Sequence, residues 1–223
     1  KRHIESQINQ AFQHLNKGRQ EAAQSICGEI LGDPPDDIET LVQLGLLCTA
    51  LARTPQAIAI FSRAVESKPD SAVYLGYLGR ALMEGNQWLE AEAILRMAVQ
   101  KEPGLPEPLI NLGAVNVRLG NYSEAIELLE RAIALKPSEP NIYANITIAL
   151  SQTGRHAEAL KYLEKALRLD PGNPNSYDSL GRLLTQLGRA DEAISHFEKA
   201  IKLNRIHGLA YQGIANARKF SEK

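Results

Sequence analysis

An alanine recurs along this chain at a constant spacing of 34 residues. Self-similarity at one fixed period is typical of proteins built from repeated structural units, and here six occurrences stay in register. The period therefore constrains the fold more strongly than the composition does. The alanine column consists of Ala23, Ala57, Ala91, Ala125, Ala159 and Ala193.

Further columns keep the same period. A second alanine follows seven residues after the first in five of the six units, and a proline follows five residues later in five of six. Small residues, mostly glycine, stand twelve and five residues before the first alanine. The sixth unit departs from the proline column with Arg205. The columns include Ala64, Ala98, Ala132, Ala166 and Ala200; Pro35, Pro69, Pro103, Pro137 and Pro171; Gly45, Gly79, Gly113 and Gly181; and Gly18, Gly120, Gly154 and Gly188.

Each unit has the pattern of two amphipathic helices. Over residues 141–152 apolar side chains recur at spacings of three and four, which predicts a helix that ends at Gly154. A second apolar stripe over 157–169 is followed by Asp-Pro-Gly-Asn-Pro at 170–174, which predicts the end of the second helix. A small residue such as Gly181 lets the two backbones approach closely where the helices cross. One hairpin cannot bury its own apolar face, so consecutive units must stack.

The sixth unit carries a recognisable motif. It reads Tyr-x-x-Leu-Gly-x-x-Leu from Tyr177 and Ala-x-x-x-Phe-x-x-Ala from Ala193. With the period and the proline column, this pattern resembles the tetratricopeptide repeat. The resemblance implies an all-α fold, a right-handed superhelical solenoid of antiparallel helix pairs, as a single domain over residues 1–223. Its repeats would span 4–37, 38–71, 72–105, 106–139, 140–173 and 174–207, followed by a capping helix over 208–220.

Composition excludes several classes of partner. Lys and Arg number 25 against 26 Asp and Glu, so the chain lacks the positive excess of a nucleic-acid-binding surface. No apolar run is long enough to span a membrane, and no signal segment opens the chain. Cys27 and Cys48 form no C-x-x-C motif and are typical of buried free thiols in a reducing compartment. We therefore expect a cytoplasmic protein without a nucleic-acid partner or membrane insertion.

The resemblance also implies a binding surface. In this family the first helix of each unit lines a concave groove that binds an extended peptide or a partner helix. The second, fifth, sixth, ninth and twelfth residues of each unit face that groove, and the sixth column is the most informative here. A carboxamide both donates and accepts hydrogen bonds, so a column of them can bracket a peptide backbone, which resembles the asparagine ladder of the O-GlcNAc transferase repeats. The alternative is that asparagine is merely tolerated on a wet helix face. The column consists of Asn9, Gln43, Tyr77, Asn111, Asn145 and Ser179.

Two arginines complete the candidate groove. Arg80 and Arg182 are the ninth residues of the third and sixth units, where each is a candidate to bind an acidic group of a ligand. Solvated surface charge is the alternative for both. Chaperone-binding members of the family carry Lys and Asn at two positions of the first unit that Ile8 and Phe12 occupy here, which argues against recognition of chaperone C-termini.

The residue patterns of enzymes are missing from the sequence. The histidines fall at different repeat positions without an i, i+4 pair, and the glycines follow the repeat columns rather than a phosphate loop. We therefore predict no catalytic, metal or cofactor site. The predicted function is a non-catalytic protein–protein interaction scaffold that binds a peptide or protein segment.

Two alternatives stay open. The chain starts without Met, and its end from Tyr211 onward weakly resembles the junction of bacterial repeat arrays with catalytic domains. These features favour a substrate-recruiting or dimerising arm of a larger transferase, sulfotransferase-like or O-GlcNAc-transferase-like, with its catalytic domain outside this chain. The atypical end units favour a third interpretation, self-association by end-to-end stacking.

Overall fold

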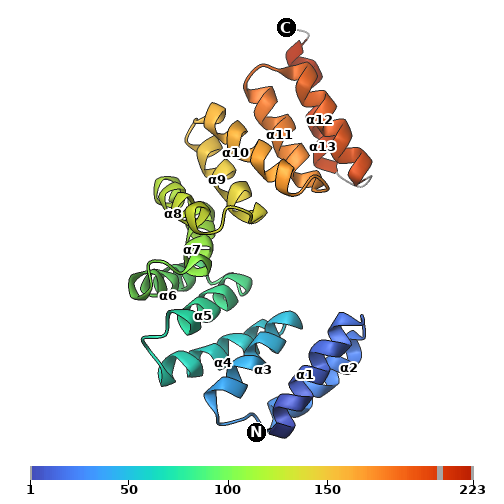
Figure 1. Cartoon of the computed structure of the whole chain (residues 1–223). Helices are drawn as coiled ribbons and strands as arrows, with labels where there is room; N and C mark the ends of the chain where they lie inside the picture. The colour runs from blue at the N-terminus through green and yellow to red at the C-terminus, as the bar shows by residue number, and fades with distance from the viewer. Residues whose placement is uncertain (1, 205–207, 222–223) are drawn as a thin grey trace. The chain divides into compact units, whose positions relative to one another are not determined.

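The computed structural model describes residues 2–204 and 208–221, and these residues form thirteen α-helices (Figure 1). Arg205 and the end of the sixth predicted repeat lie outside the described residues, as do Lys1 and residues 222–223. The helices are α1 (Arg2–Asn16), α2 (Gln20–Gly32), α3 (Ile38–Ala50), α4 (Thr54–Ser67), α5 (Ala72–Glu84), α6 (Trp88–Lys101), α7 (Pro106–Leu119), α8 (Tyr122–Leu135), α9 (Pro140–Gln152), α10 (His156–Leu169), α11 (Pro174–Gln186), α12 (Ala190–Leu203) and α13 (Gly208–Ser221).

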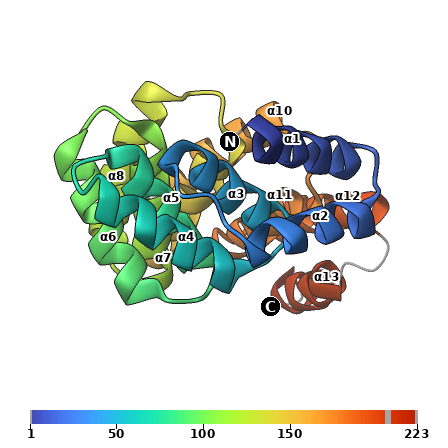
Figure 2. The same ribbon diagram turned by 90° about the horizontal axis from the view of Figure 1, so that it is seen from below.

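The helices pack in sequential pairs, which confirms the predicted all-α fold class. They group into two compact units, residues 1–115 and 116–223. In the first unit α1 packs against α2 and α3, α3 against α4, and α5 against α4 and α6. In the second unit α9 packs against α8 and α10, and α11 packs against α10, α12 and α13, as the two views in Figures 1 and 2 illustrate. That residues 1–223 form one continuous domain stays a prediction.

Small residues at the helix crossings explain the close pairing. A Cβ atom placed on Gly79 would lie 2.4 Å from Cγ of Leu95, and one placed on Gly181 would lie 2.6 Å from Cε1 of Phe197. Both distances are far below van der Waals contact, so a larger residue must push the second helix of the pair outward. Phe197 is held from two sides, because a Cβ on Gly213 of α13 would lie 2.4 Å from the same ring atom.

The turn between the two helices of each hairpin has the same geometry in all six repeats. The backbone N–H of the residue before the second helix donates to the carbonyl five residues earlier, as from Arg155 to Leu150 at 2.9 Å. The residue directly before the donor has a positive φ, which is 77° at Gly154 and 55° at Ala52. This pattern is the Schellman C-cap, in which the left-handed residue closes the helix and reverses the chain. The same bond joins Arg19 to His14, Arg53 to Cys48, Gln87 to Leu82, Asn121 to Asn116 and Arg189 to Leu184.

Proline and capping residues set the connections between hairpins. Each proline of the column, such as Pro171 after α10, follows the end of a second helix within a few residues, where it prevents the helix from continuing. Asn173 then caps α11, because its side chain accepts hydrogen bonds from the backbone N–H groups of Asn175 and Ser176. Helix α11 therefore starts at a defined residue.

We expect the glycine column to be sensitive to a single methyl group. Gly181→Ala forces the Cβ atom against the rigid Phe197 ring, and we expect it to lower the free energy of unfolding by about 1–3 kcal/mol. Urea unfolding followed by far-UV circular dichroism measures the change. Gly172→Ala is the control, since its Cβ would meet nothing closer than Asp170 Oδ1 at 3.7 Å. Equal unfolding midpoints for the two variants would contradict the packing argument.

Candidate functional site

A polar cavity of about 560 Å³ lies between α9 and α11, the first helices of the fifth and sixth repeats. Most of its lining side chains are amides and hydroxyls, and Arg182 is the one charged residue among them. Such a surface can donate and accept hydrogen bonds without attracting either sign of charge strongly. The lining residues are Asn141, Ala144, Thr147, Ile148, Ser151, Gln152, Leu163, Asn173, Asn175, Ser176, Ser179, Arg182, Leu183 and Gln186.

Arg182 is oriented by its own helix. Its Nε lies 3.3 Å from Oδ2 of Asp178, whose side chain is only 3% exposed, and its Nη2 donates to Oγ of Ser179 at 3.4 Å. The buried carboxylate compensates the guanidinium charge, while the Arg182 side chain itself stays 60% exposed. Arg182 therefore presents hydrogen-bond donors to the cavity with little net charge behind them.

A second cavity, of about 300 Å³, lies between α5 and the start of α7. Its lining is more apolar and includes Val73 and Pro108 beside the half-buried Tyr77. The Tyr77 ring packs against the ring of Phe61, with ring centroids 5.4 Å apart. Arg80 lies at the rim, where its Nε is 3.7 Å from Oε1 of Glu84. The remaining lining residues are Ala72, Gly76, Leu105, Glu107 and Asn111.

The structure brings some of the sequence-predicted groove residues together and leaves others apart. Tyr77, Arg80 and Asn111 share the α5–α7 cavity, and Ser179 and Arg182 share the α9–α11 cavity. The other three predicted residues belong to neither lining. Asn9 is exposed on α1 in a shallow depression with Arg2, Glu5, Ser6, Gln10 and Gln13, Gln43 is exposed on α3, and Asn145 is half-buried on α9.

The sequence reasoning missed several polar residues of the α9–α11 cavity. Asn141 and Asn175 are the second residues of their repeats, and Gln152 and Gln186 are the thirteenth. Each pair repeats the same residue type at the 34-residue spacing. The family resemblance places the second column on the groove, but the predicted site residues come from the sixth and ninth columns.

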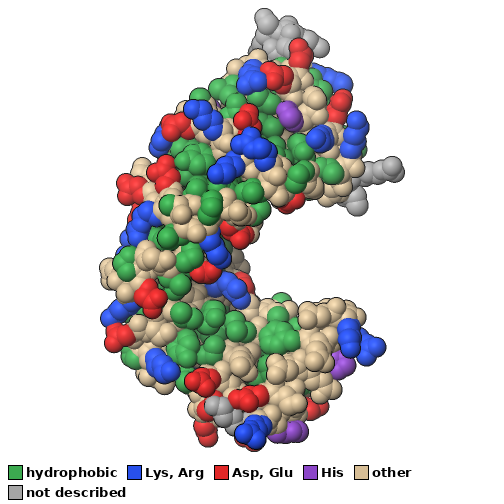
Figure 3. Space-filling view, in the orientation of Figure 1, with side chains coloured by type: hydrophobic (Ala, Val, Ile, Leu, Met, Phe, Trp, Pro, Cys, Tyr) green, Lys and Arg blue, Asp and Glu red, His purple; other side chains and the backbone are tan. Residues whose placement is uncertain are grey.

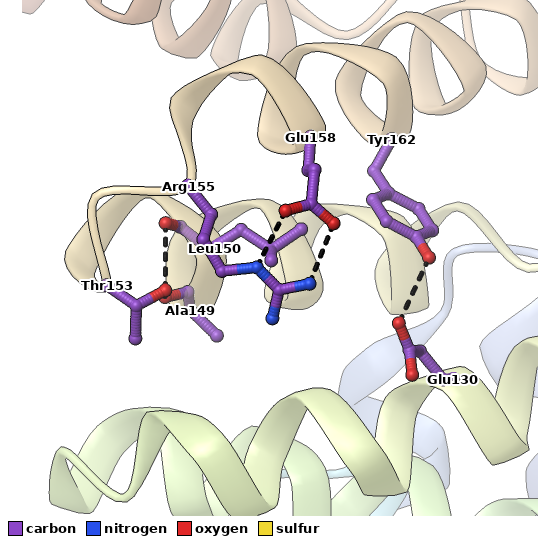
Figure 4. Close-up of polar contacts among 7 residues, drawn as sticks. All are labelled: Glu130, Ala149, Leu150, Thr153, Arg155, Glu158 and Tyr162. Atoms are coloured by element: carbon purple, nitrogen blue, oxygen red, sulfur yellow. Dashed lines mark hydrogen bonds and ion pairs between the residues drawn. The ribbon is translucent and has the colours of Figure 1, made fainter.

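A polar cluster joins α10 to α8 outside these cavities (Figure 4). Nε and Nη2 of Arg155 donate to the two carboxylate oxygens of Glu158 at 2.8 and 2.7 Å, and the Tyr162 hydroxyl donates to Glu130 at 3.4 Å. The hydrogen bonds from Arg155 lower the pKa of Glu158 below its ordinary value. Partial burial, followed by the nearby Glu130 carboxylate, raises the pKa of Tyr162. The cluster therefore consists of one exposed ion pair at the start of α10 and one hydrogen bond between α10 and α8.

Charged side chains and possible metal ligands are spread over the described part of the chain. Lys and Arg side chains lie interspersed with Asp and Glu on the face shown in Figure 3. Residues 2–204 and 208–221 include no cluster of three or more His, Cys, Asp or Glu side chains that could hold a metal ion. Within the same residues, each helix is too short or too polar to traverse a lipid bilayer.

Comparison with known proteins agrees with the helix pattern. The model of a family described as the cilia and flagella-associated protein 70 C-terminal domain matches residues 3–217. The comparison with curated proteins gave no match. The matched family model is that of a repeat domain rather than of an enzyme.

Solved structures show the same fold. A MamA structure from Desulfovibrio magneticus RS-1 has a TM-score of 0.70 and 19% identity over 78% of this chain and 98% of that one. TTC0263, a thermophilic tetratricopeptide repeat (TPR) protein in Thermus thermophilus, has a TM-score of 0.62 and 21% identity, covering 82% and 100%. YrrB, described as a TPR protein with an unusual peptide-binding site, has a TM-score of 0.67 and 20% identity, covering 83% and 96%.

We expect the pKa of Glu158 to depend on one neighbour. Replacing Arg155 by Gln removes the charge-assisted hydrogen bonds, so the pKa of Glu158 should rise toward its ordinary value, as measured by carbon-detected NMR titration. Because folding lowers this pKa, the stabilisation from Glu158 is present at neutral pH and is lost as the pH falls through the folded-state pKa.

A second pair provides the internal control. Arg189 and Glu192 stand 34 residues further on with donor–acceptor distances of 2.7 and 2.6 Å, and the hydrogen bonds from Arg189 lower the pKa of Glu192 in the same way. In Arg155→Gln the pKa of Glu192 should stay low. A Glu158 titration that is unchanged in this variant would show that the pair does not form in solution.

Proposed function

Because the chain belongs to the family of the cilia and flagella-associated protein 70 C-terminal domain, a tetratricopeptide repeat domain, we propose that it is a non-catalytic scaffold that binds an extended peptide or protein segment. A bound segment lies along first helices within a compact unit, as between α5 and α7 in the first and between α9 and α11 in the second. This proposal assigns binding rather than catalysis to the chain, in agreement with the repeat-domain character of the matched family.

The lining of the two cavities carries the proposal. Each cavity lies between consecutive first helices, and each offers side chains that bind a peptide in a different way. Amides such as Asn141 and Asn175 both donate and accept, as the alternating N–H and C=O groups of an extended backbone require. The α5–α7 cavity instead accommodates an apolar side chain of the bound segment beside Tyr77.

The sixth column adds further contacts to this proposal. Asn111 lines the α5–α7 cavity, whereas Asn145 is half-buried on α9 beside the cavity residue Ala144. We assign to both asparagines hydrogen bonds with the backbone of the bound segment. Asn9 on α1, Gln43 on α3 and Ser179 on α11 make additional polar contacts with bound segments. The description of YrrB as a TPR protein with an unusual peptide-binding site is consistent with peptide binding on this fold.

The family name also bears on location. We propose that the chain acts in the cytoplasm and associates there with cilia or flagella where the cell has them. A protein or peptide is then the partner, and the near-neutral charge of the chain agrees with a partner other than nucleic acid.

Loss of the asparagine pair tests the sixth column. In Asn111→Ala with Asn145→Ala, each lost hydrogen bond removes about 0.5–1.5 kcal/mol, so binding should weaken by roughly tenfold or more. The probes are peptides selected from a random phage-displayed library on the unaltered chain, with affinity measured by fluorescence polarisation. The urea unfolding midpoint should stay nearly constant. Gln100→Ala is the control, because Gln100 is exposed on the second helix α6.

A second variant separates the cavity from the column. Asn141→Ala with Asn175→Ala removes two amides from the α9–α11 lining, and a similar loss of affinity is expected for peptides that bind there. If this variant binds weakly while the Asn111 and Asn145 variant binds normally, the cavity is correct and the sixth column is wrong. If neither variant affects binding, or the library yields no binding peptide, the proposed function is wrong.

A further inference from the structure

The two cysteines of the chain meet in the core. Cys27 lies on α2 and Cys48 on α3, and both side chains are 0% exposed. Their sulfur atoms are 3.8 Å apart, although the residues are 21 positions apart in the sequence. Both thiols are free. The pair joins the second helix of the first repeat to the first helix of the second repeat.

The thiol pair is specific to this junction between repeats. At the repeat position of Cys27 the other five units carry large apolar residues, and at the repeat position of Cys48 they carry Leu, His or Asn. Both positions are therefore cysteine only where these two helices face each other. The equivalents of Cys27 are Phe61, Leu95, Leu129, Leu163 and Phe197, and those of Cys48 are His14, Leu82, Asn116, Leu150 and Leu184.

The surroundings prepare one of the two thiols for reaction. The pKa of Cys27 is lowered to about 7, chiefly by its hydrogen bond with Cys48 and further by the Arg53 cation, against the opposing effect of burial. Arg53 is held near the pair because its Nη2 donates to the Gln24 carbonyl at 3.3 Å. The hydrogen bond with Cys27, together with burial, raises the pKa of Cys48. Thiolate and thiol side by side is the arrangement that thiol–disulfide exchange requires.

The distance to a covalent bond is short. A disulfide has an S–S length near 2.05 Å, so the sulfur atoms must approach by roughly 1.8 Å. Rotation about the two Cα–Cβ bonds, or a shift of α2 toward α3, must provide this approach. Because both thiols are buried, a reagent reaches them only when the two helices separate transiently.

We propose that Cys27 and Cys48 are a redox modification site, at which a small-molecule disulfide such as oxidised glutathione converts the buried thiol pair into a reversible disulfide between α2 and α3. The Cys27 thiolate attacks one sulfur of oxidised glutathione, and a first glutathione thiolate leaves. Cys48 then gives up its proton and attacks the Cys27 sulfur, and a second glutathione leaves. The protein loses two electrons and two protons, and oxidised glutathione is reduced to two thiols.

Formation of this bond changes the stability of the junction. The disulfide closes the loop between residues 27 and 48, so it reduces the conformational freedom of the unfolded chain. By linkage, the equilibrium constant for disulfide formation is larger in the folded chain than in the unfolded chain. The ratio of these two constants equals the factor by which the disulfide raises the equilibrium constant for folding. We expect that factor to be about a hundredfold.

The test is a redox titration of the whole chain. Folded protein is equilibrated with mixtures of reduced and oxidised glutathione. An alkylating reagent then quenches the exchange, and mass spectrometry measures the mass of the chain. The expected product has lost two hydrogens, carries no alkyl group and yields a linked Cys27–Cys48 peptide. Reduction with dithiothreitol should restore two alkylatable thiols. The equilibrium constant for oxidation should be about a hundredfold higher in buffer than in concentrated urea.

Single variants distinguish the intramolecular bond from other oxidation. Cys27→Ser and Cys48→Ser each leave one thiol, which can form only a glutathione adduct or a disulfide between two chains. The oxidised unaltered chain should also unfold at a higher urea concentration than the reduced chain, and the variants should show no such shift. Two unreacted thiols at every glutathione ratio, a doubly glutathionylated chain, or equal oxidation constants in buffer and urea would each overturn the proposal.

Discussion

The close approach of paired helices at a single small residue underlies the rest of this structure. Gly79 and Gly181 lie where a methyl group would collide with Leu95 and Phe197, so the backbones of each hairpin are as near as their side chains allow. Close packing restricts the angle at which the two helices of a hairpin cross. The apolar stripe that this pairing leaves uncovered must then be buried against the neighbouring hairpin. The surfaces between first helices, which hold both cavities, result from this stacking.

Periodicity was sufficient to predict the fold. The glycine and proline columns mark the ends of helices, and the helices found over 140–152 and 156–169 lie within one residue of those expected from the sequence. Ala52 and Asn86 adopt the left-handed turn that the other units assign to glycine, with φ of 55° and 59°. Asn adopts this conformation more readily than most residues, whereas at Ala52 the hydrogen bonds and packing of the hairpin impose it.

The site was harder to predict from the sequence because several positions of the first helix are polar in most repeats. Asn145 and Asn141 are both asparagines of one helix, but only Asn141 lies in the cavity lining. Which of them faces the cavity depends on the rotation of α9 against α11, and no single helix encodes that rotation. Cys27 and Cys48 present the same difficulty, since their contact crosses a repeat junction. Such a contact is found only by pairing a position on the second helix of one repeat with the position that faces it on the first helix of the next repeat. Comparing residues within one column does not reveal it.

The hairpin turn has a consequence for how this protein is made. Each turn is closed by a backbone hydrogen bond that spans five residues, and helices in each unit pack against those one or two places along the chain. Contacts between such near neighbours form quickly, because little chain must be brought together to make them. A hairpin emerging from the ribosome can therefore pack against the previous one while later repeats are still being synthesised. The growing end needs protection only for its newest apolar stripe.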